Sequence, residues 1–230
     1  MTTRKGFIVA TAALAATPQI ASAASPSPRP APSQAPIPKL NFDLAAFDAL
    51  LDREIAHKHL FADRKIDGGS GLDAVRSTLN AYRDIGVAVA DVATAMVLYH
   101  GPSISIAMDD YVWDTYLIPG QPAIKKASPE MSADFSSVLT PKTKGNPLLK
   151  PKPNDYDASV QALSADGLRF FVCNNALRGF AEAVAKSLNV HATDVYADLA
   201  KHFVPNTTIV PAGVWAIHYS QQKRYTLLQT

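Results

Sequence analysis

The sequence predicts an α/β protein in which helices cover both faces of a mostly parallel sheet of about five strands. Two observations support this fold class. Short uncharged runs of β-branched and aromatic residues alternate with longer stretches whose apolar residues recur at helical spacing. In addition, the 230 residues are 47% hydrophobic and 18% charged, which supplies one ordinary core and excludes a chain that is disordered throughout.

Charge and cysteine content exclude several classes of protein. The chain has 22 basic and 20 acidic residues, and this balance is not that of a nucleic-acid binder. Its single cysteine excludes an internal disulfide and any metal site built from several cysteines. We therefore expect no nucleic-acid partner and, after removal of a leader, no membrane span.

Residues 1–23 have the order of a secretory signal peptide. Arg4 and Lys5 form a basic start, an apolar run follows, and small residues precede a cleavage site after Ala23. The alternative is a short buried helix. Lys5 replaces the second arginine of a twin-arginine motif, so both the Tat and the Sec routes stay open. We expect a periplasmic or secreted protein whose mature chain has equal numbers of basic and acidic residues.

Residues 24–40 form a Pro-rich linker, and residues 41–230 form the folded domain. Six prolines fall almost every second residue between Pro26 and Pro38. Such a segment is extended and semi-rigid, so we interpret it as a spacer and not as a ligand of an SH3-type domain.

In the first half of the domain, we expect two helices and a strand before the turn at Gly101-Pro102. Asn41 or Asp43 caps a helix that ends near His57 and His59, and a second helix runs from Leu72 to Ile85 after a glycine-rich loop. The run Val92 to Tyr99 is typical of a buried strand. The expected elements that follow are a fifth strand at Ser103 to Ala107 and a helix at Met108 to Leu117.

The second half begins with a stretch, Pro119 to Pro153, that lacks periodicity and is rich in proline and lysine. We interpret it as a covering loop or an arm to a neighbouring subunit. The elements predicted after it are a helix from Val160 to Gly167, a strand from Leu168 to Cys173, helices at 176–188 and 195–203, a strand at Thr207 to Val210, a helix at 214–223 and a strand at Tyr225 to Leu228.

Reactive side chains fall where ligands bind in open α/β sheets, beyond the carboxyl ends of the strands. Cys173 ends one predicted strand just before a helix that Asn174 or Asn175 can cap, and Arg178 lies about one turn into it. The positive end of a helix favours a thiolate, which is the nucleophilic form of cysteine. The alternative is that Cys173 is a small buried hydrophobe.

Two further turns contribute candidate binding residues. His100 and Gly101 end the strand at Val92 to Tyr99, where the glycine allows a ligand to approach closely. Pro211 and Gly213 form a strand-to-helix turn that we expect to line the same pocket as Cys173. The alternative for His100 is a hydrogen bond within its turn.

These segments together resemble the DsrE/DsrF-like family of sulfur-relay proteins, in particular its exported members. The resemblance covers roughly Leu72 to Leu228. The segments that carry it are Val97-Leu98-Tyr99-His100-Gly101-Pro102, Trp113 to Tyr116, Asn146-Pro147, Phe171-Val172-Cys173-Asn174-Asn175-Ala176-Leu177, and Val210-Pro211-Ala212-Gly213-Val214 with Gln221.

The resemblance implies a flavodoxin-like three-layer fold, an oligomer, and a role for Cys173 in carrying sulfur as a persulfide. Two features differ from the well-understood relay proteins of the family. Those proteins are cytoplasmic, whereas we expect export here, and they have small apolar residues after the cysteine where this sequence has two asparagines. A single thiol has no internal resolving partner, which suits a carrier better than a complete redox enzyme.

Three functions therefore stay open. The first is an exported DsrE-like protein that binds or relays a sulfur species through Cys173, as a homo-oligomer that meets a sulfur-donor or acceptor protein and needs no cofactor. The second is a non-enzymatic small-ligand-binding or assembly protein in which the cysteine is inert. The third is a metal-binding protein that uses His57, His59 or His218, although two histidines two residues apart cannot share a helix face.

Overall fold

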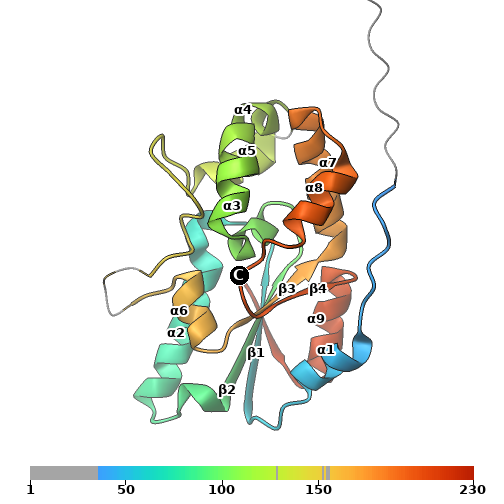
Figure 1. Ribbon diagram of the computed structural model, residues 1–230. Helices are drawn as coiled ribbons and strands as arrows, with labels where there is room; N and C mark the ends of the chain where they lie inside the picture. The colour runs from blue at the N-terminus through green and yellow to red at the C-terminus, as the bar shows by residue number, and fades with distance from the viewer. Residues whose placement is uncertain (1–35, 128, 152, 154–155) are drawn as a thin grey trace, which may run out of the picture. The chain divides into compact units, whose positions relative to one another are not determined.

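Five parallel strands form the centre of the protein and confirm the predicted α/β class with its flavodoxin-like three-layer sandwich (Figure 1). The structure is a computed structural model that describes residues 36–127, 129–151, 153 and 156–230. The strand order is β4-β3-β2-β1-β5. The strands are β1 (His57–Asp63), β2 (Val92–Leu98), β3 (Arg169–Cys173), β4 (Thr207–Val210) and β5 (Thr226–Gln229).

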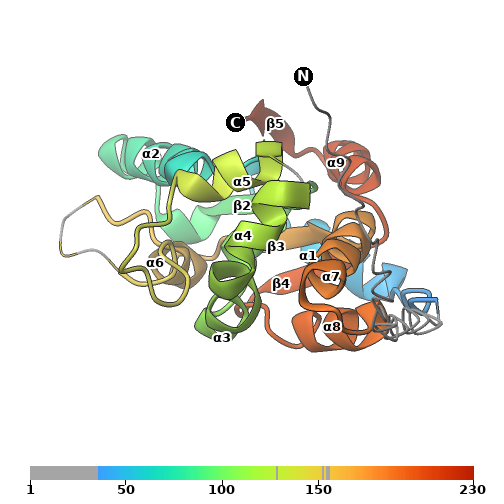
Figure 2. The same cartoon turned by 90° about the horizontal axis from the view of Figure 1, so that it is seen from above.

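Helices connect these strands and cover both faces of the sheet (Figures 1 and 2). Their bounds are α1 (Leu44–Leu51), α2 (Ser70–Asp84), α3 (Asp110–Val112), α4 (Ile118–Ala127), α5 (Pro129–Ser136), α6 (Val160–Ala165), α7 (Asn174–Leu188), α8 (Ala192–Leu199) and α9 (Gly213–Gln222). Several begin at the caps that their sequences supply. Asp43 accepts a hydrogen bond from the Ala46 amide at 2.9 Å, and Asp109 accepts one from the Val112 amide at 3.2 Å.

Successive side chains of β2 point to opposite faces of the sheet, and this alternation explains why there is a hydrophobic core on each face. Ala93, Ala95 and Val97 belong to a buried cluster with residues of α1 and α9, whereas Met96 and Leu98 belong to the larger cluster on the opposite face. A strand that is buried on both faces is typically apolar and uncharged. All seven residues of β2 are buried, and six of them are apolar, Thr94 being the exception.

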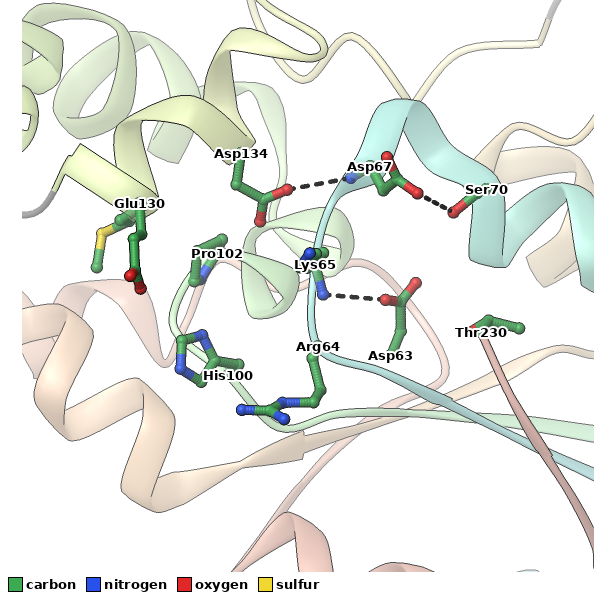
Figure 3. Close-up of a pocket in the computed structure, with 11 residues that line it drawn as sticks. Asp63, Arg64, Lys65, Asp67, Ser70, His100, Pro102, Glu130, Asp134 and Thr230 are labelled. Atoms are coloured by element: carbon green, nitrogen blue, oxygen red, sulfur yellow. Dashed lines mark hydrogen bonds between the residues drawn. The ribbon is translucent and has the colours of Figure 1, made fainter.

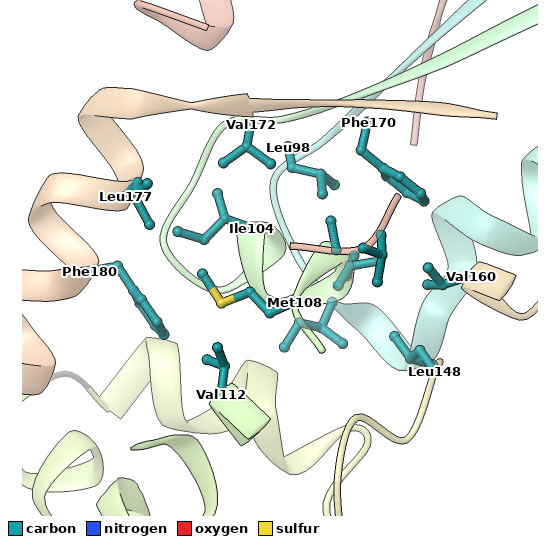
Figure 4. Close-up of a cluster of buried hydrophobic side chains, with 14 of the residues drawn as sticks. Leu98, Ile104, Met108, Val112, Leu148, Val160, Phe170, Val172, Leu177 and Phe180 are labelled. Carbon is teal, nitrogen blue, oxygen red and sulfur yellow. The ribbon is translucent and has the colours of Figure 1, made fainter. Parts of the chain in front are cut away.

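The larger core lies between the sheet and the helices α2, α6, α7 and α8 (Figure 4). Side chains from β2 and β3 meet side chains from α7 and from the segment between β2 and α3. The residues that Figure 4 labels are Leu98, Ile104, Met108, Val112, Leu148, Val160, Phe170, Val172, Leu177 and Phe180.

The placement of His57 and His59 near the end of a helix was wrong. The helix α1 ends at Leu51, and both histidines lie in β1, which pairs with β2 and β5. The intervening Lys58 obscured this strand in the sequence because a buried lysine is rare. Its ammonium group donates to the Leu51 carbonyl at 2.8 Å and so satisfies the C-terminus of α1.

The proposed fifth strand at Ser103 to Ala107 was also wrong, because this segment is a buried 3₁₀ helix. Pro102 has the αR conformation, and the Ser105 hydroxyl donates back to the Pro102 carbonyl at 2.7 Å. Such local serine bonds compete with strand pairing.

The interpretation of Pro119 to Pro153 as irregular throughout was wrong as well, since the stretch contains most of α4 and all of α5. Proline is compatible with the first position of a helix, which is where Pro129 lies in α5. The irregular part that follows is attached to the core by Asn146, whose amide donates to the carbonyls of Ile106 at 2.9 Å and Met108 at 2.7 Å.

The expected signal peptide at 1–23 and the first part of the expected linker lie outside the described residues. Of the linker, residues 36–40 are described, and Ile37 is only 6% exposed within the larger core cluster. Among the helices of the described residues, none is both long and apolar enough to cross a membrane.

Candidate functional site

Cys173 lies at the junction of β3 and α7. It is the last residue of the strand and the N-cap of the helix, where its Sγ accepts a hydrogen bond from the Ala176 amide at 3.5 Å. The residue is 5% exposed. The predicted position at a strand end before a helix is therefore correct, and the thiol is covered by protein.

The structure brings the predicted Pro211 turn beside Cys173. Cys173 pairs with Val210 in the parallel register of β3 and β4, so Pro211 follows directly at the neighbouring strand end. The helices after these two strands, α7 and α9, lie on opposite faces of the sheet (Figure 1). Adjacent strands whose connections diverge in this way form the crevice where open α/β sheets often bind ligands.

Protein groups occupy much of this crevice. Asn174 is buried and accepts a hydrogen bond from the Tyr196 hydroxyl at 2.6 Å, while Asn175 is exposed. Arg178 donates to the Pro38 carbonyl at 3.4 Å. Gly213 lies against the Tyr99 side chain so closely that a Cβ atom at position 213 would overlap with it.

A pocket of about 500 Å³ lies at the carboxyl ends of β1 and β2 (Figure 3). We call it the Asp63 pocket. Of the residues predicted from sequence, His100 lines it, whereas Gly101 lies in the same turn beside Phe180 and Met131. The lining residues are Asp63, Arg64, Lys65, Asp67, Ser70, His100, Pro102, Glu130, Met131, Asp134 and Thr230.

Asp63, the last residue of β1, is the most buried acid of this pocket at 2% exposure. Its Oδ1 accepts a hydrogen bond from the Lys65 amide at 3.0 Å, but its Oδ2 has no hydrogen-bond partner among the described residues. Burial raises the pKa of Asp63 to about 6, and the nearby carboxylates of Asp134 and Asp67 add to this rise. The group therefore titrates close to neutral pH.

Helix α5 is fixed over the pocket through the loop that follows β1. The Asp134 carboxylate accepts hydrogen bonds from the Ile66 amide at 3.0 Å and from the Asp67 amide at 3.2 Å. The Ser137 hydroxyl oxygen accepts another from the Gly68 amide at 3.0 Å. These bonds position Glu130 and Asp134 opposite the strand ends (Figure 3).

Sequence reasoning missed Asp63, Arg64 and Lys65 because it did not recognise β1. A usable signal was present, since the apolar run Leu60 to Ala62 is followed by charged residues and then by the glycine-rich loop that begins a helix. It also missed Glu130 and Asp134, which lie in a segment that was expected to be irregular.

The histidines that we weighed as metal ligands lie in two separate places. The His59 Nε2 is 2.8 Å from the Tyr82 hydroxyl, and the His57 ring lies 4.6 Å from the Tyr82 ring between centroids. His218 lies on α9, 3.1 Å from Gln222. In the part of the chain that the structure describes, no group of three or more histidine, cysteine or acidic residues is placed to hold a metal ion.

The fold and this pocket define a flavodoxin-like α/β protein with a cavity at the ends of its strands that several charged residues line. No protein-family model matches the sequence, and no match was found among curated proteins. The structure of a protein of unknown function from Methanobacterium thermoautotrophicum is similar with a TM-score of 0.37 and 14% identity, over 76% of this chain and 99% of that chain. Function has to be inferred from the geometry of the site.

Proposed function

We propose that the protein binds a small polar molecule in the Asp63 pocket. The observation that carries this proposal is the buried Asp63 carboxyl group, which has an unpartnered Oδ2 and lines a pocket at the strand ends. A buried acid without full hydrogen bonding lowers the stability of the fold, and such groups are concentrated at functional sites.

Size and position support the same conclusion. A volume of about 500 Å³ lies within the ~300–1,000 Å³ range of ligand pockets. The carboxyl ends of parallel strands are the usual position for ligands in this fold class. The burial of Cys173 at 5% exposure favours this reading over a relay function, because a sulfur carrier needs an accessible thiol.

A ligand screen observed by NMR tests the proposal. The probes are small amines, carboxylates, zwitterions, phosphates and sugars, and hits are mapped on the ¹⁵N spectrum of the folded domain. We expect at least one class to shift the backbone amides of Lys65, Gly68 and His100. The variant His100→Trp should abolish these shifts because the larger ring fills the pocket. Hits that map only elsewhere, or that survive His100→Trp unchanged, overturn the proposal.

Sulfur relay through Cys173 is a second candidate, and the position of its Sγ at the N-terminus of α7 favours it. The Ala176 amide that donates to this sulfur would also stabilise a thiolate. The transfer we propose moves one sulfane sulfur from a polysulfide to the Cys173 thiolate. One S–S bond forms in the protein persulfide, one breaks in the donor, and the shortened polysulfide leaves with the electron pair.

Intact mass distinguishes this candidate. A relay protein gains one sulfur atom after incubation with polysulfide and loses it with reductant, and Cys173→Ser does not. The alkylation rate of Cys173 is measured in parallel in the folded and the unfolded protein. A thiol that stays unmodified by polysulfide until the protein unfolds rejects the relay function.

Export and self-association remain proposals that rest on the sequence. N-terminal sequencing of the protein recovered from a periplasmic fraction should begin at Ala24 if residues 1–23 are a signal peptide. Sedimentation equilibrium of the mature chain tests the expected homo-oligomer, and a single monomeric species would reject it.

A further inference from the structure

We propose that the ligand of the Asp63 pocket is a zwitterion, a small molecule with a protonated amino group at one end and a carboxylate or similar anionic group at the other. This inference rests on the proposed function, because it assigns a ligand class to the same pocket. The observations that carry it are the arrangement of charged side chains on the pocket walls and their lack of partners.

The exposed charged side chains of the pocket differ in sign between its two sides, whereas Asp63 is buried at the end of β1 beside Arg64. Figure 3 shows Arg64 and His100 at the strand ends and Glu130 and Asp134 across from them on α5, with the Asp134 carboxylate directed at the Asp67 amide. Lys65 lies between these two walls. A ligand that spans the pocket therefore meets the Arg64 guanidinium group at one end and the Glu130 carboxylate at the other.

The charges of the two walls do not neutralise one another. Among the ion pairs of the described residues, none involves Arg64, Lys65 or Glu130. Arg64 contacts the Tyr99 ring, with its guanidinium carbon 6.0 Å from the ring centroid, and this contact leaves its hydrogen-bond donors free for an anion. Three charged groups are thus available to a ligand without breaking an existing ion pair.

A ligand with charge of only one sign would meet side chains of its own sign, because four acidic residues line the pocket together with Arg64 and Lys65. An anion near Arg64 and Lys65 is repelled by the carboxylates of Asp67, Glu130 and Asp134, which line the same space. A simple cation that reaches those carboxylates is repelled by Arg64 and Lys65. A molecule with both charges gains from both walls, and like-charge repulsion is a strong source of specificity.

Three probes with the same five-carbon skeleton separate these cases. They are 5-aminopentanoate, which has both charges, pentanoate, which has only the anion, and pentylamine, which has only the cation. Each is titrated into the folded protein while the amide signals of Lys65, Gly68 and His100 are followed. We expect 5-aminopentanoate to bind at least tenfold more tightly than either analogue.

Variants on the two walls make the test specific. Arg64→Gln should remove the advantage of 5-aminopentanoate over pentylamine, and Glu130→Gln should remove its advantage over pentanoate. Both residues are exposed, so neither change threatens the fold. Lys142→Gln, an exposed lysine outside the pocket, is the matched control and should leave all three affinities unchanged.

The outcomes separate the ligand class from the function. Equal affinities for the three probes, or tighter binding of pentanoate or pentylamine at these amides, overturn the zwitterion while small-ligand binding stands. If no probe binds but another class from the screen does, the zwitterion is overturned in the same way. If the whole screen gives no shift at the pocket, the proposed function fails together with the inference.

Discussion

The carboxyl group of Asp63 occupies the space that a side chain at position 71 would need. A Cβ atom on Gly71 would overlap with the Asp63 Oδ2 and would contact the Met96 side chain. Gly71 is the second residue of α2, so the missing side chain lets the helix begin directly against the acid at the end of β1. The partial positive charge of this helix N-terminus compensates in part for the burial of the carboxyl group.

The first prediction concerns Gly71→Ala. The added methyl group must displace the Asp63 carboxyl group, and overpacking of this kind costs about 1–3 kcal/mol. Urea unfolding measures the loss in the free energy of unfolding. Gly179→Ala is the control, since nothing lies within 4 Å of a Cβ atom at this helical position, and it should stabilise the protein by about 0.5–1 kcal/mol. Equal stability of Gly71→Ala and wild type would contradict the close contact.

The second prediction is a pH dependence of stability that comes from Asp63. Its pKa in the folded protein is raised from 3.8 to about 6, so the folded state holds its proton more tightly than the unfolded state does. The resulting stabilisation is fully present below the unfolded pKa and is lost as the pH rises through about 6. Stability should therefore fall with rising pH in this window.

The variant Asp63→Asn isolates this effect because asparagine does not titrate. The full rise in the pKa of Asp63 corresponds to about 3 kcal/mol of folding stability. About 2 kcal/mol of this stability should be lost between pH 4.5 and pH 7.5. We expect wild type to lose this amount relative to Asp63→Asn in urea unfolding across that range. Parallel stability curves for the two proteins would show that Asp63 has an ordinary pKa.

The strands without interior charge, β2 to β5, were predictable from the sequence. β2 and β3 follow runs without interior charge, and their positions were expected almost to the residue. β1 was not recognised, because Lys58 lies inside it and its charge is accommodated by tertiary contacts. Its ammonium group donates to the carbonyl group of Leu51, a few residues before the strand, and to that of Lys223, which is distant in sequence. A contact of this kind leaves no periodic signal.

The candidate site was predictable only in part for the same reason. His100 follows a recognised strand, and its place at a strand end was foreseen. Asp63 is the last residue of the unrecognised strand β1. Glu130 and Asp134 come from α5, whose lysine- and proline-rich surroundings resemble a loop. The pocket is made by elements that only the tertiary fold brings together.

The third prediction compares two arginines that share one partner. Arg76 is buried, donating to the Asp157 carbonyl and to Asp166, each at 2.6 Å, whereas Arg83 is 43% exposed and reaches Asp166 at 3.1 Å. Arg76→Met should lower the free energy of unfolding by about 2–3 kcal/mol, because it removes a buried hydrogen bond and the buried partner of the Asp166 carboxylate. Arg83→Met should cost less than about 1 kcal/mol. Thermal and urea unfolding of both variants provide the comparison, and a similar loss for both would contradict the burial argument.

The fourth prediction concerns Asn146, which attaches the segment after α5 to the core. Its side-chain amide donates to the carbonyls of Ile106 and Met108, its Oδ1 accepts from the Leu148 amide at 2.9 Å, and the residue is 3% exposed. Asn146→Ala removes all of these bonds at once. Buried groups left without a partner cost about 1–3 kcal/mol each, so we expect a total loss of at least about 2 kcal/mol.

The loss of stability in Asn146→Ala should be confined to the region around the substitution. The backbone amide of Asn146 donates to the Asp110 side chain at 2.8 Å, and that of Gly145 donates to the Asp114 side chain at 2.7 Å. Neither bond uses the Asn146 side chain, so this end of the segment stays attached to α3 and to the helical turn that follows α3. Hydrogen exchange in Asn146→Ala should therefore accelerate most at Leu148 and Leu149, whose side chains pack in the core beside the lost bonds, and least in the strands. Asn175→Ala, at an exposed position of α7, is the control and should change stability by less than about 0.5 kcal/mol. Uniform acceleration across the sheet would mean that Asn146 stabilises the whole fold and not the attachment of this segment.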